Sequence, residues 1–374
     1  MPKKLNILMF GPAYGHNIQP FIEFFEANTS YELTFAYSGQ NDFLASTKNV
    51  KFIEYSKSLF SLLKLTSTIK KEYDIIWYHG GYELNILRFI FLFKHKNTKI
   101  VLNVWGEHIP RIMLKNNAES KKYLKYYKKA YIIQCNWFGV QKLLLTNFPE
   151  DKLPVLLWGL DATFFKRTNS VLRPVTQDFI ESIDTEKINF FYPKSFTEAS
   201  DHDCIIEAVK LLKEKGAYQF CVYFWTGNVS RGNFEKDAVE KIKRYQLEEF
   251  IKIEQHEFLP FIDIKAIWEK MDCGLQISIN DQLSSTLLEP MYLKRELIAT
   301  NIEPYQILLE KFPELELHLI ERKPKALAFR MDDFIDGNTT SDAVLENRKK
   351  VIEKEFNFKK NIQKMMDYYL QLLK

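Results

Sequence analysis

Cysteine is scarce in this chain of 374 residues, and no two cysteines have the spacing of a metal or redox motif. The four cysteines, at positions 135, 204, 221 and 273, form no CxxC pair. Scattered cysteines argue against a disulfide framework and a structural zinc site, and they favour a reducing cytosol. We therefore expect a cytoplasmic protein without a structural zinc site.

Long hydrophobic runs are missing as well. No stretch of about 18 uninterrupted apolar residues occurs, so no membrane-spanning helix is expected. The first residues, MPKKLNILMFG, have a short apolar part and no small-residue cleavage site. That pattern favours a first buried strand over a signal peptide.

The GxGxxG motif of dinucleotide-binding proteins is also absent at the first glycine loop. Gly11 and Gly15 follow the predicted strand Lys4–Phe10 with a different spacing, so NAD binding is not inferred. A glycine loop after a first strand often lies over a ligand, but it also makes an ordinary tight turn. Gly15 is therefore a candidate ligand-binding residue, with the plain turn as the open alternative.

What the chain does contain is a twofold series of short apolar runs alternating with amphipathic segments. Runs typical of buried strands include Tyr73–His79, Ile188–Tyr192 and Phe220–Thr226, and 56–71 is typical of one amphipathic helix. The alternation predicts an α/β chain with two doubly wound, Rossmann-like domains. We place them at 1–165 and 188–350, with a polar linker at 166–187 and a C-terminal helix at 351–374.

Charge is unevenly distributed along the chain. Residues 1–160 hold 21 Lys and Arg against 12 Asp and Glu, whereas the remainder holds 31 against 36. The most basic segment, 110–129, interleaves lysines with apolar and aromatic side chains, which suits an anionic membrane surface or an ordinary solvated helix face. No nucleic-acid-binding motif accompanies the charge, so a nucleic-acid partner is not expected.

The stretch 271–300 has the pattern strand, loop, helix, strand, and it carries two carboxylates eight positions apart. Asp281 lies in the predicted loop and Glu289 in the predicted helix. Ligands bind at the carboxyl edge of open parallel sheets, and free amides at a helix start attract anions. The amides of Ser284, Ser285 and Thr286 are thus candidates for holding a diphosphate. The alternative is that both carboxylates are ordinary surface groups.

Asp281-x7-Glu289, within Leu288-Glu289-Pro290-Met291, resembles the Glu-x7-Glu motif of retaining nucleotide-sugar glycosyltransferases of the GT-B fold. The family 4-like enzymes of bacterial surface-polysaccharide synthesis are the nearest type. The resemblance implies two domains facing across a cleft and a C-terminal helix that crosses back to the first domain. No metal is expected, because no acidic pair such as Asp-x-Asp follows a strand at a cleft edge. The resemblance also implies that Asp281 contacts the donor sugar and Glu289 the ribose. Here the first acid is one methylene shorter, and Pro290 replaces a small helix former.

The diphosphate-binding cations of that family are only partly present. Its members commonly have Gly-Arg after the first strand of the second domain and Lys-Gly about five residues later. Lys194 stands in place of the arginine, whereas the chain reads Ser200-Asp201-His202 where the lysine is expected. His202 or Arg231 could supply the second cation.

His108 is the candidate catalytic residue of the first domain. It follows the predicted strand Lys99–Trp105 in a Trp-Gly-Glu-His segment, where related enzymes carry Trp-Gly-x-Asp. A histidine there can hydrogen-bond a sugar hydroxyl or transfer a proton. The segment Trp158–Phe165 similarly resembles the domain crossing of these enzymes, and Gln255–Pro260 their loop over the nucleotide base.

The resemblance thus implies a glycosyltransferase that moves a sugar from a nucleoside diphosphate donor to a glycan or lipid-linked glycan at the cytoplasmic membrane face. It needs no cofactor beyond the donor. Two interpretations compete with it. The missing lysine and the shorter Asp281 favour a non-catalytic binding or scaffold subunit of the same fold. A sugar-nucleotide epimerase is the other, and it leaves the basic first half unexplained.

Overall fold

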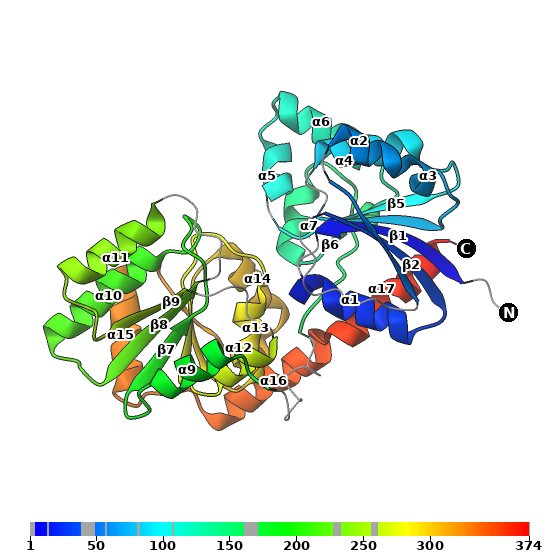
Figure 1. The fold of residues 1–374 in the computed structure, drawn as a ribbon. Coiled ribbons are helices and arrows are strands. Elements are labelled where there is room, and N and C mark those ends of the chain that lie inside the picture. Colours follow the sequence, from blue (N-terminus) through cyan, green and yellow to red (C-terminus); the bar gives the residue numbers. More distant parts are fainter. Residues whose placement is uncertain are drawn as a thin grey trace. The chain divides into compact units, whose positions relative to one another are not determined.

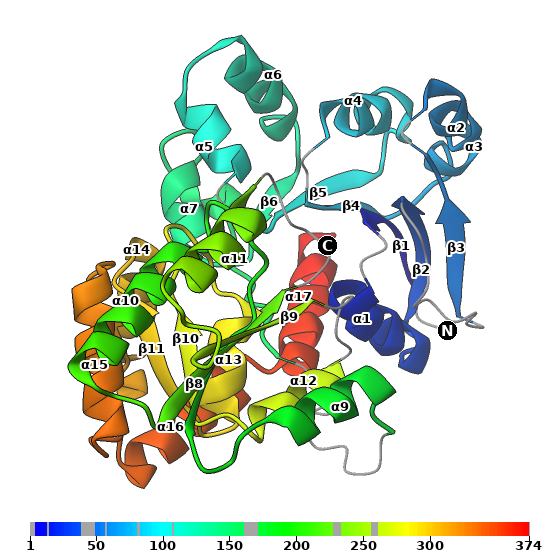
Figure 2. The same ribbon diagram turned by 60° about the vertical axis from the view of Figure 1, so that its left-hand side comes forward.

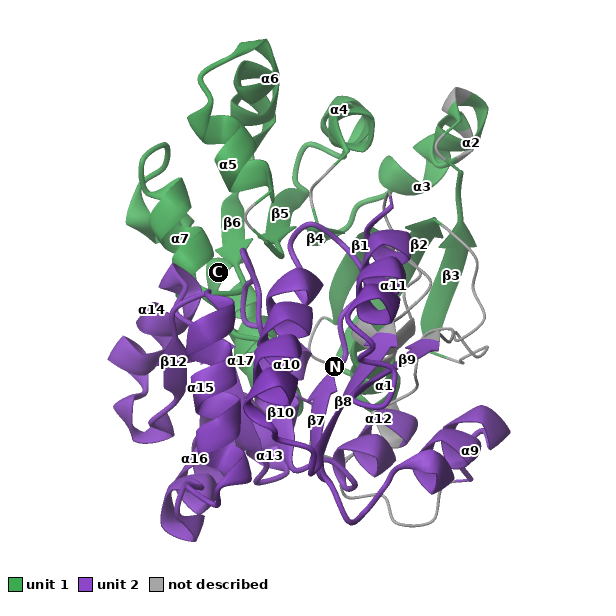
Figure 3. Ribbon diagram, turned by 90° about the vertical axis from the view of Figure 1, so that its left-hand side faces the viewer, with its two compact units in different colours: residues 1–158, 358–374 green, residues 159–357 purple. Residues whose placement is uncertain are grey.

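A computed structural model describes residues 4–12, 15–38, 49–56, 58–80, 83–106, 108–160, 171–226, 233–255 and 261–373. The chain forms two compact units (Figure 3). Unit 1 comprises residues 1–158 and 358–374, and unit 2 comprises residues 159–357. Each unit is built around one parallel sheet of six strands.

Unit 1 has a doubly wound sheet in the order β3-β2-β1-β4-β5-β6 (Figure 1). Its strands are β1 (Leu5–Pro12), β2 (Tyr31–Ser38), β3 (Val50–Glu54), β4 (Ile75–His79), β5 (Lys99–Val104) and β6 (Ile132–Cys135). Helices α1 (Gly15–Ala27) and α17 (Phe358–Leu372) cover one face. The other face is covered by α2 (Leu59–Lys64), α3 (Thr66–Ile69), α4 (Leu84–Phe93), α5 (His108–Leu114), α6 (Ala118–Tyr127) and α7 (Phe138–Leu144).

Unit 2 repeats the arrangement in the order β12-β11-β10-β7-β8-β9 (Figure 2). Its strands are β7 (Ile188–Tyr192), β8 (Phe220–Thr226), β9 (Ile251–Gln255), β10 (Cys273–Gln276), β11 (Glu296–Thr300) and β12 (His318–Ile320). One face packs against α10 (His202–Lys215), α11 (Phe234–Arg244) and α15 (Pro324–Ile335). The other packs against α9 (Pro174–Ser182) and α12 (Phe261–Trp268). Helices α13 (Ser285–Tyr292), α14 (Glu303–Lys311) and α16 (Asp342–Glu355) complete the unit.

The last helix, α17, belongs to unit 1. Its buried face, including Met365, Met366 and Tyr369, packs with α1 against the first sheet. The segment that precedes it runs beside the start of unit 2, where the Leu160 amide donates to the Phe356 carbonyl at 2.7 Å. Gly159 has φ +102° there, and a Cβ on it would lie 1.9 Å from the Phe356 carbonyl oxygen, so the close approach requires glycine.

The predicted fold class is confirmed, because both sheets are parallel and doubly wound. The structure differs locally from the sequence-based expectations. The predicted helix 56–71 is two short helices that meet at Leu65. Residues 174–182, in the predicted polar connection, form α9, which buries Phe179 against the second sheet. None of the helices in the described residues has the length and apolarity to cross a membrane.

Candidate functional site

Most of the predicted site residues meet at the carboxyl edge of the unit 2 sheet, where parallel α/β sheets bind ligands. Lys194 follows β7, and Asp281 follows β10 in the loop that leads to α13. Ser284 is the N-cap of α13, and Glu289 lies in its second turn. Pro290 does not end the helix, which continues to Tyr292 as predicted.

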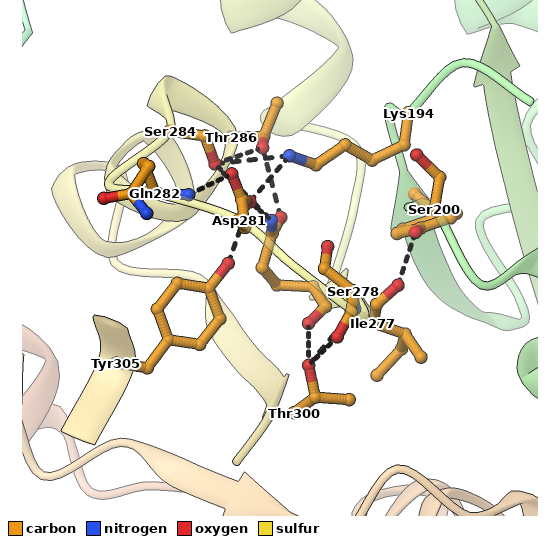
Figure 4. A network of polar contacts seen from close by, with 12 residues as sticks. Lys194, Ser200, Ile277, Ser278, Asp281, Gln282, Ser284, Thr286, Thr300 and Tyr305 are labelled. Atoms are coloured by element: carbon orange, nitrogen blue, oxygen red, sulfur yellow. Dashed lines mark hydrogen bonds and ion pairs between the residues drawn. The ribbon is translucent and has the colours of Figure 1, made fainter. Parts of the chain in front are cut away.

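Asp281 is the centre of this cluster (Figure 4). Its Oδ2 accepts hydrogen bonds from the Lys194 ammonium at 3.0 Å, the Ser284 hydroxyl at 3.0 Å and the Tyr305 hydroxyl at 2.9 Å. The Gln276 amide also donates to this oxygen. Asp281 therefore joins β10, α13, α14 and the loop after β7 through one carboxylate oxygen.

The remaining contacts close the cluster into a network. The Lys194 ammonium lies 3.3 Å from the Ser284 hydroxyl, and the Thr286 hydroxyl donates to the side-chain Oε1 of Gln276 at 3.1 Å. The other oxygen of Asp281 accepts a hydrogen bond from the backbone amide of Gln282 at 2.7 Å. The backbone amide of Ser284 donates to the backbone carbonyl of Gln282. The backbone amides of Ser285 and Thr286, the first two residues of α13, have no acceptor within the helix.

Glu289 is enclosed rather than open to solvent. Its side chain is 3% exposed, and its Oε2 accepts a hydrogen bond from the Trp268 indole at 2.9 Å. Burial raises the pKa of the Glu289 carboxyl, whereas the hydrogen bonds from Trp268 and Ser285 lower it. Contact between Glu289 and a ribose therefore requires the side chains that bury Glu289, including Trp268, to move.

His202 fixes the loop that carries Lys194. One ring nitrogen lies 2.7 Å from the Ser200 carbonyl oxygen, and the other lies 3.1 Å from the Lys194 carbonyl oxygen. These contacts favour the charged ring, but burial outweighs them and lowers the pKa of His202 to about 4. His202 is neutral at pH 7, so it is not the second cation of a diphosphate site. Arg231 lies outside the described residues.

The other two candidates belong to unit 1. Gly15 is the first residue of α1, and His108 is the exposed first residue of α5, directly beyond the carboxyl end of β5. Glu107, the segments 161–165 and 256–260, and thus most of the predicted crossing and base loop, lie outside the described residues.

Sequence analysis missed three residues of the unit 2 site. Gln276 is a fully buried amide at the end of an otherwise apolar strand, which was a detectable signal. Tyr305 and Trp268 sit in helices as ordinary aromatic core residues, and nothing in the local sequence indicates that they bond to Asp281 and Glu289. In the described part of the chain, no three His, Cys, Asp or Glu side chains are grouped as metal ligands.

Unit 1 has its own buried polar group, at the end of a strand. His79, at the end of β4, is 1% exposed and is surrounded by the rings of Phe21, Trp77, Trp105 and Trp158 at centroid distances of 4.4–5.1 Å. Burial holds the pKa of His79 well below its usual value. The ring is therefore neutral at pH 7.

Solved structures resemble the chain over its whole length. A glycosyltransferase from Rickettsia africae is 19% identical, with a TM-score of 0.76 and coverage of 100% of both chains. HepE from Anabaena, in complex with UDP, is 13% identical with a TM-score of 0.75, over 98% of this chain and 100% of its own. A UDP-N-acetylglucosamine 2-epimerase is 12% identical with a TM-score of 0.61, over 99% and 96%.

No protein-family model matches the chain, and no curated protein matches it. At these low identities the structural similarity establishes the fold alone. The chain therefore has the two-domain, Rossmann-like architecture of GT-B glycosyltransferases, as the motif around Asp281 and Glu289 implied.

Proposed function

We propose that this protein is a glycosyltransferase that takes a sugar from a nucleoside diphosphate donor held by unit 2. One observation carries the proposal. The Lys194 ammonium is held at the carboxyl edge of the second sheet, beside the first amides of α13, in a fold shared with a UDP-binding protein. A cation and free helix amides together form a site for a diphosphate.

The proposed chemistry relies on charge stabilisation. As the bond between sugar and diphosphate breaks, negative charge develops on the leaving group, and the transition state is dissociative. Lys194 and the amides of Ser285 and Thr286 would stabilise that charge in place, since they are already oriented before the donor binds. Glu289 would bind the ribose and Asp281 the donor sugar, with retention of configuration and without a metal.

His108 and Gly15 complete the proposal on the unit 1 side. His108, exposed at the carboxyl end of β5, is proposed to contact the reacting sugar, and Gly15 is proposed to lie near bound substrate. The acceptor is proposed to be a glycan or a lipid-linked glycan.

Glu289→Ala should abolish donor turnover, and Glu289→Gln, which keeps an acceptor for Trp268, controls for folding.

The first test is thermal unfolding of the protein with UDP, GDP, ADP, CMP and dTDP. A ligand at a hundredfold excess over its dissociation constant stabilises the native state by about 2.7 kcal/mol. We expect a selective shift with one diphosphate, and loss of that shift in Lys194→Met. No shift with any nucleotide would overturn the proposed donor site.

We also propose that unit 1 docks on an anionic membrane, where a lipid-linked acceptor would lie. Apolar side chains on α2 and α4 are exposed, with Phe60 at 69%, Leu63 at 50% and Leu92 at 73%. The same face of the sheet carries the exposed basic residues Lys70, Lys71, Arg111, Lys115, Lys121, Lys122 and Lys125. Interfacial binding combines buried apolar area with attraction to anionic lipid.

Vesicle sedimentation tests the docking surface. We expect binding to vesicles that contain phosphatidylglycerol, little binding to phosphatidylcholine alone, and weakening by salt. A Phe60→Ser, Leu92→Ser double variant should lose binding. Phe329→Ser, which removes an equally exposed phenylalanine from unit 2, should retain it. Equal binding by both variants would contradict the assignment to unit 1.

A non-catalytic nucleotide-binding subunit remains the second candidate, and one observation favours it. Asp281 has both carboxylate oxygens occupied by protein donors, and Glu289 is buried under Trp268. Binding of a nucleoside diphosphate without any release of sugar from the donor would support this candidate. An epimerase would act on the sugar nucleotide without an acceptor, and no contact in the described residues favours it.

A further inference from the structure

We propose that Tyr305 is a positioning residue of the diphosphate site, acting on Lys194 through Asp281. This proposal rests on the proposed function. Tyr305 is fully buried, and its hydroxyl lies 2.9 Å from the same carboxylate oxygen that the Lys194 ammonium contacts at 3.0 Å. A residue that never meets the ligand would thus set the place of the cation that does.

Asp281 needs such support because it lies in a loop. Its backbone follows the end of β10, and the carboxylate can rotate unless donors hold it. Tyr305 and Gln276 are both fully buried and stand on regular elements, α14 and β10, so their donor atoms are fixed by packing. They reach the oxygen from α14 and β10, whereas Lys194 reaches it from the loop after β7; Figure 4 shows Tyr305 and Lys194 approaching Asp281 from different sides.

Lys194 is then anchored at both ends. Its carbonyl lies 3.1 Å from the His202 ring, and its ammonium contacts Asp281 and Ser284. A lysine ammonium has three donors, so one remains for a phosphate oxygen. A long side chain that is already ordered loses less conformational entropy when the ligand binds, which raises affinity. Asp281 thereby converts a mobile cation into a preorganised one.

The competing explanation is that the Tyr305 hydroxyl merely stabilises the core. Tyr192 provides a matched control, because it is also fully buried and its hydroxyl donates a 2.6 Å hydrogen bond to the Ile277 carbonyl at the same sheet edge. Tyr192 makes no hydrogen bond to Asp281 in the described network. Replacing either tyrosine by phenylalanine removes one buried hydroxyl, and only Tyr305→Phe removes one from Asp281.

Calorimetric titration with UDP and with inorganic pyrophosphate separates these explanations. Tyr305→Phe should weaken both ligands about tenfold, since it loosens a hydrogen bond to a charged group. Tyr192→Phe should bind within about twofold of the parent, because the Tyr192 hydroxyl donates to the Ile277 carbonyl and not to Asp281. Unchanged binding in Tyr305→Phe, or equal weakening in both variants, would overturn the positioning role.

A second measurement needs no ligand. Melting temperatures are compared for Tyr305→Phe, Lys194→Met and the double variant, and for the matching set with Tyr192→Phe. We expect the Tyr305 and Lys194 losses to be less than additive and the Tyr192 and Lys194 losses to add. If the losses in melting temperature add in both sets, the proposal is wrong. If the parent binds neither UDP nor pyrophosphate, the proposed function fails, and this comparison still decides the role of Tyr305.

Discussion

At the carboxyl edge of the unit 2 sheet, polar side chains from four elements meet on one oxygen of Asp281. At the corresponding edge of unit 1, the buried His79 is enclosed by aromatic rings instead. Asn103 and Gln134 lie beside it at matching register positions of β5 and β6. Among the described residues, no protein group hydrogen-bonds the His79 ring or the Asn103 amide.

The two edges differ in whether their buried polar side chains are hydrogen-bonded by other protein groups. The side chain of Asp281 is only 15% exposed, so its charge is stabilised by pairing and hydrogen bonds, and the fully buried donors of Tyr305 and Gln276 require it as an acceptor. A neutral imidazole among rings has a smaller desolvation cost, and burial keeps His79 neutral. The polar side chains of the unit 2 edge are therefore held together by an ion pair between Lys194 and Asp281, whereas His79 at the unit 1 edge is neutral.

Removing Asp281 should break the comparison most severely. Asp281→Ala leaves the Lys194 ammonium and three other donors without their common acceptor. Two of these donors, on Tyr305 and Gln276, are fully buried, so we expect a loss of about 3–5 kcal/mol in the free energy of unfolding, measured with urea. Glu269→Ala, which removes an exposed carboxylate paired with Lys265 on α12, should stay close to the parent. Equal losses would mean that the network does not stabilise the fold.

Acid should weaken the unit 2 edge through His202. Its pKa is about 4 in the folded protein against 6.5 as the ordinary value, so between these limits only the unfolded chain binds the proton. Stability therefore falls as pH decreases from 6.5 to 4, by about 3 kcal/mol for this group. His202→Gln should have a shallower slope in urea unfolding. The raised pKa of Glu289 acts oppositely but is common to both proteins. Identical slopes would contradict the role of His202.

A pair of tryptophan replacements compares the two edges directly. Trp268→Phe removes the indole donor to Glu289, and Trp77→Phe removes an indole that has no acceptor in the described part of unit 1. Both side chains are fully buried, so both variants lose similar apolar volume. We expect Trp268→Phe to cost about 2 kcal/mol more, because it also leaves a buried carboxylate less satisfied. Equal costs in urea unfolding would show that the indole bond contributes nothing net.

The smallest effect is expected at His79. His79→Phe replaces a neutral, buried ring by another ring among Phe21, Trp77, Trp105 and Trp158. The free energy of unfolding should change by no more than about 1 kcal/mol, in either direction, at pH 7. A loss as large as that of Asp281→Ala would show that His79 has polar partners comparable to those of Asp281.

Much of the fold could be predicted from the chain alone. The ranges Ile188–Tyr192 and Phe220–Thr226 match β7 and β8, because a buried parallel strand is a continuous apolar run with clear ends. The helix α9 was missed because the segment around Phe179 is largely polar. Its few apolar side chains become a buried face only when the second sheet is present beside it.

The candidate site divides in the same way. Its sequence-local part, from Asp281 through Ser284 to Glu289, follows from the order strand, loop, helix. Its long-range part does not, since Lys194 is 87 positions from Asp281 and Tyr305 is 24 positions away. His202 was misjudged as a candidate cation because its charge depends on burial, which the residues around it do not reveal.

The sequence by itself determined the periodicity of the elements, and thereby two parallel sheets whose carboxyl edges gather the loops. The positions of the buried strands and helices follow from the pattern of apolar residues, which is local and can be recognised in the sequence. The tertiary structure alone decided which donors share the Asp281 oxygen and which rings enclose His79. Those choices depend on directed contacts between distant segments, and the free energy of a buried polar group depends on whether such contacts are complete.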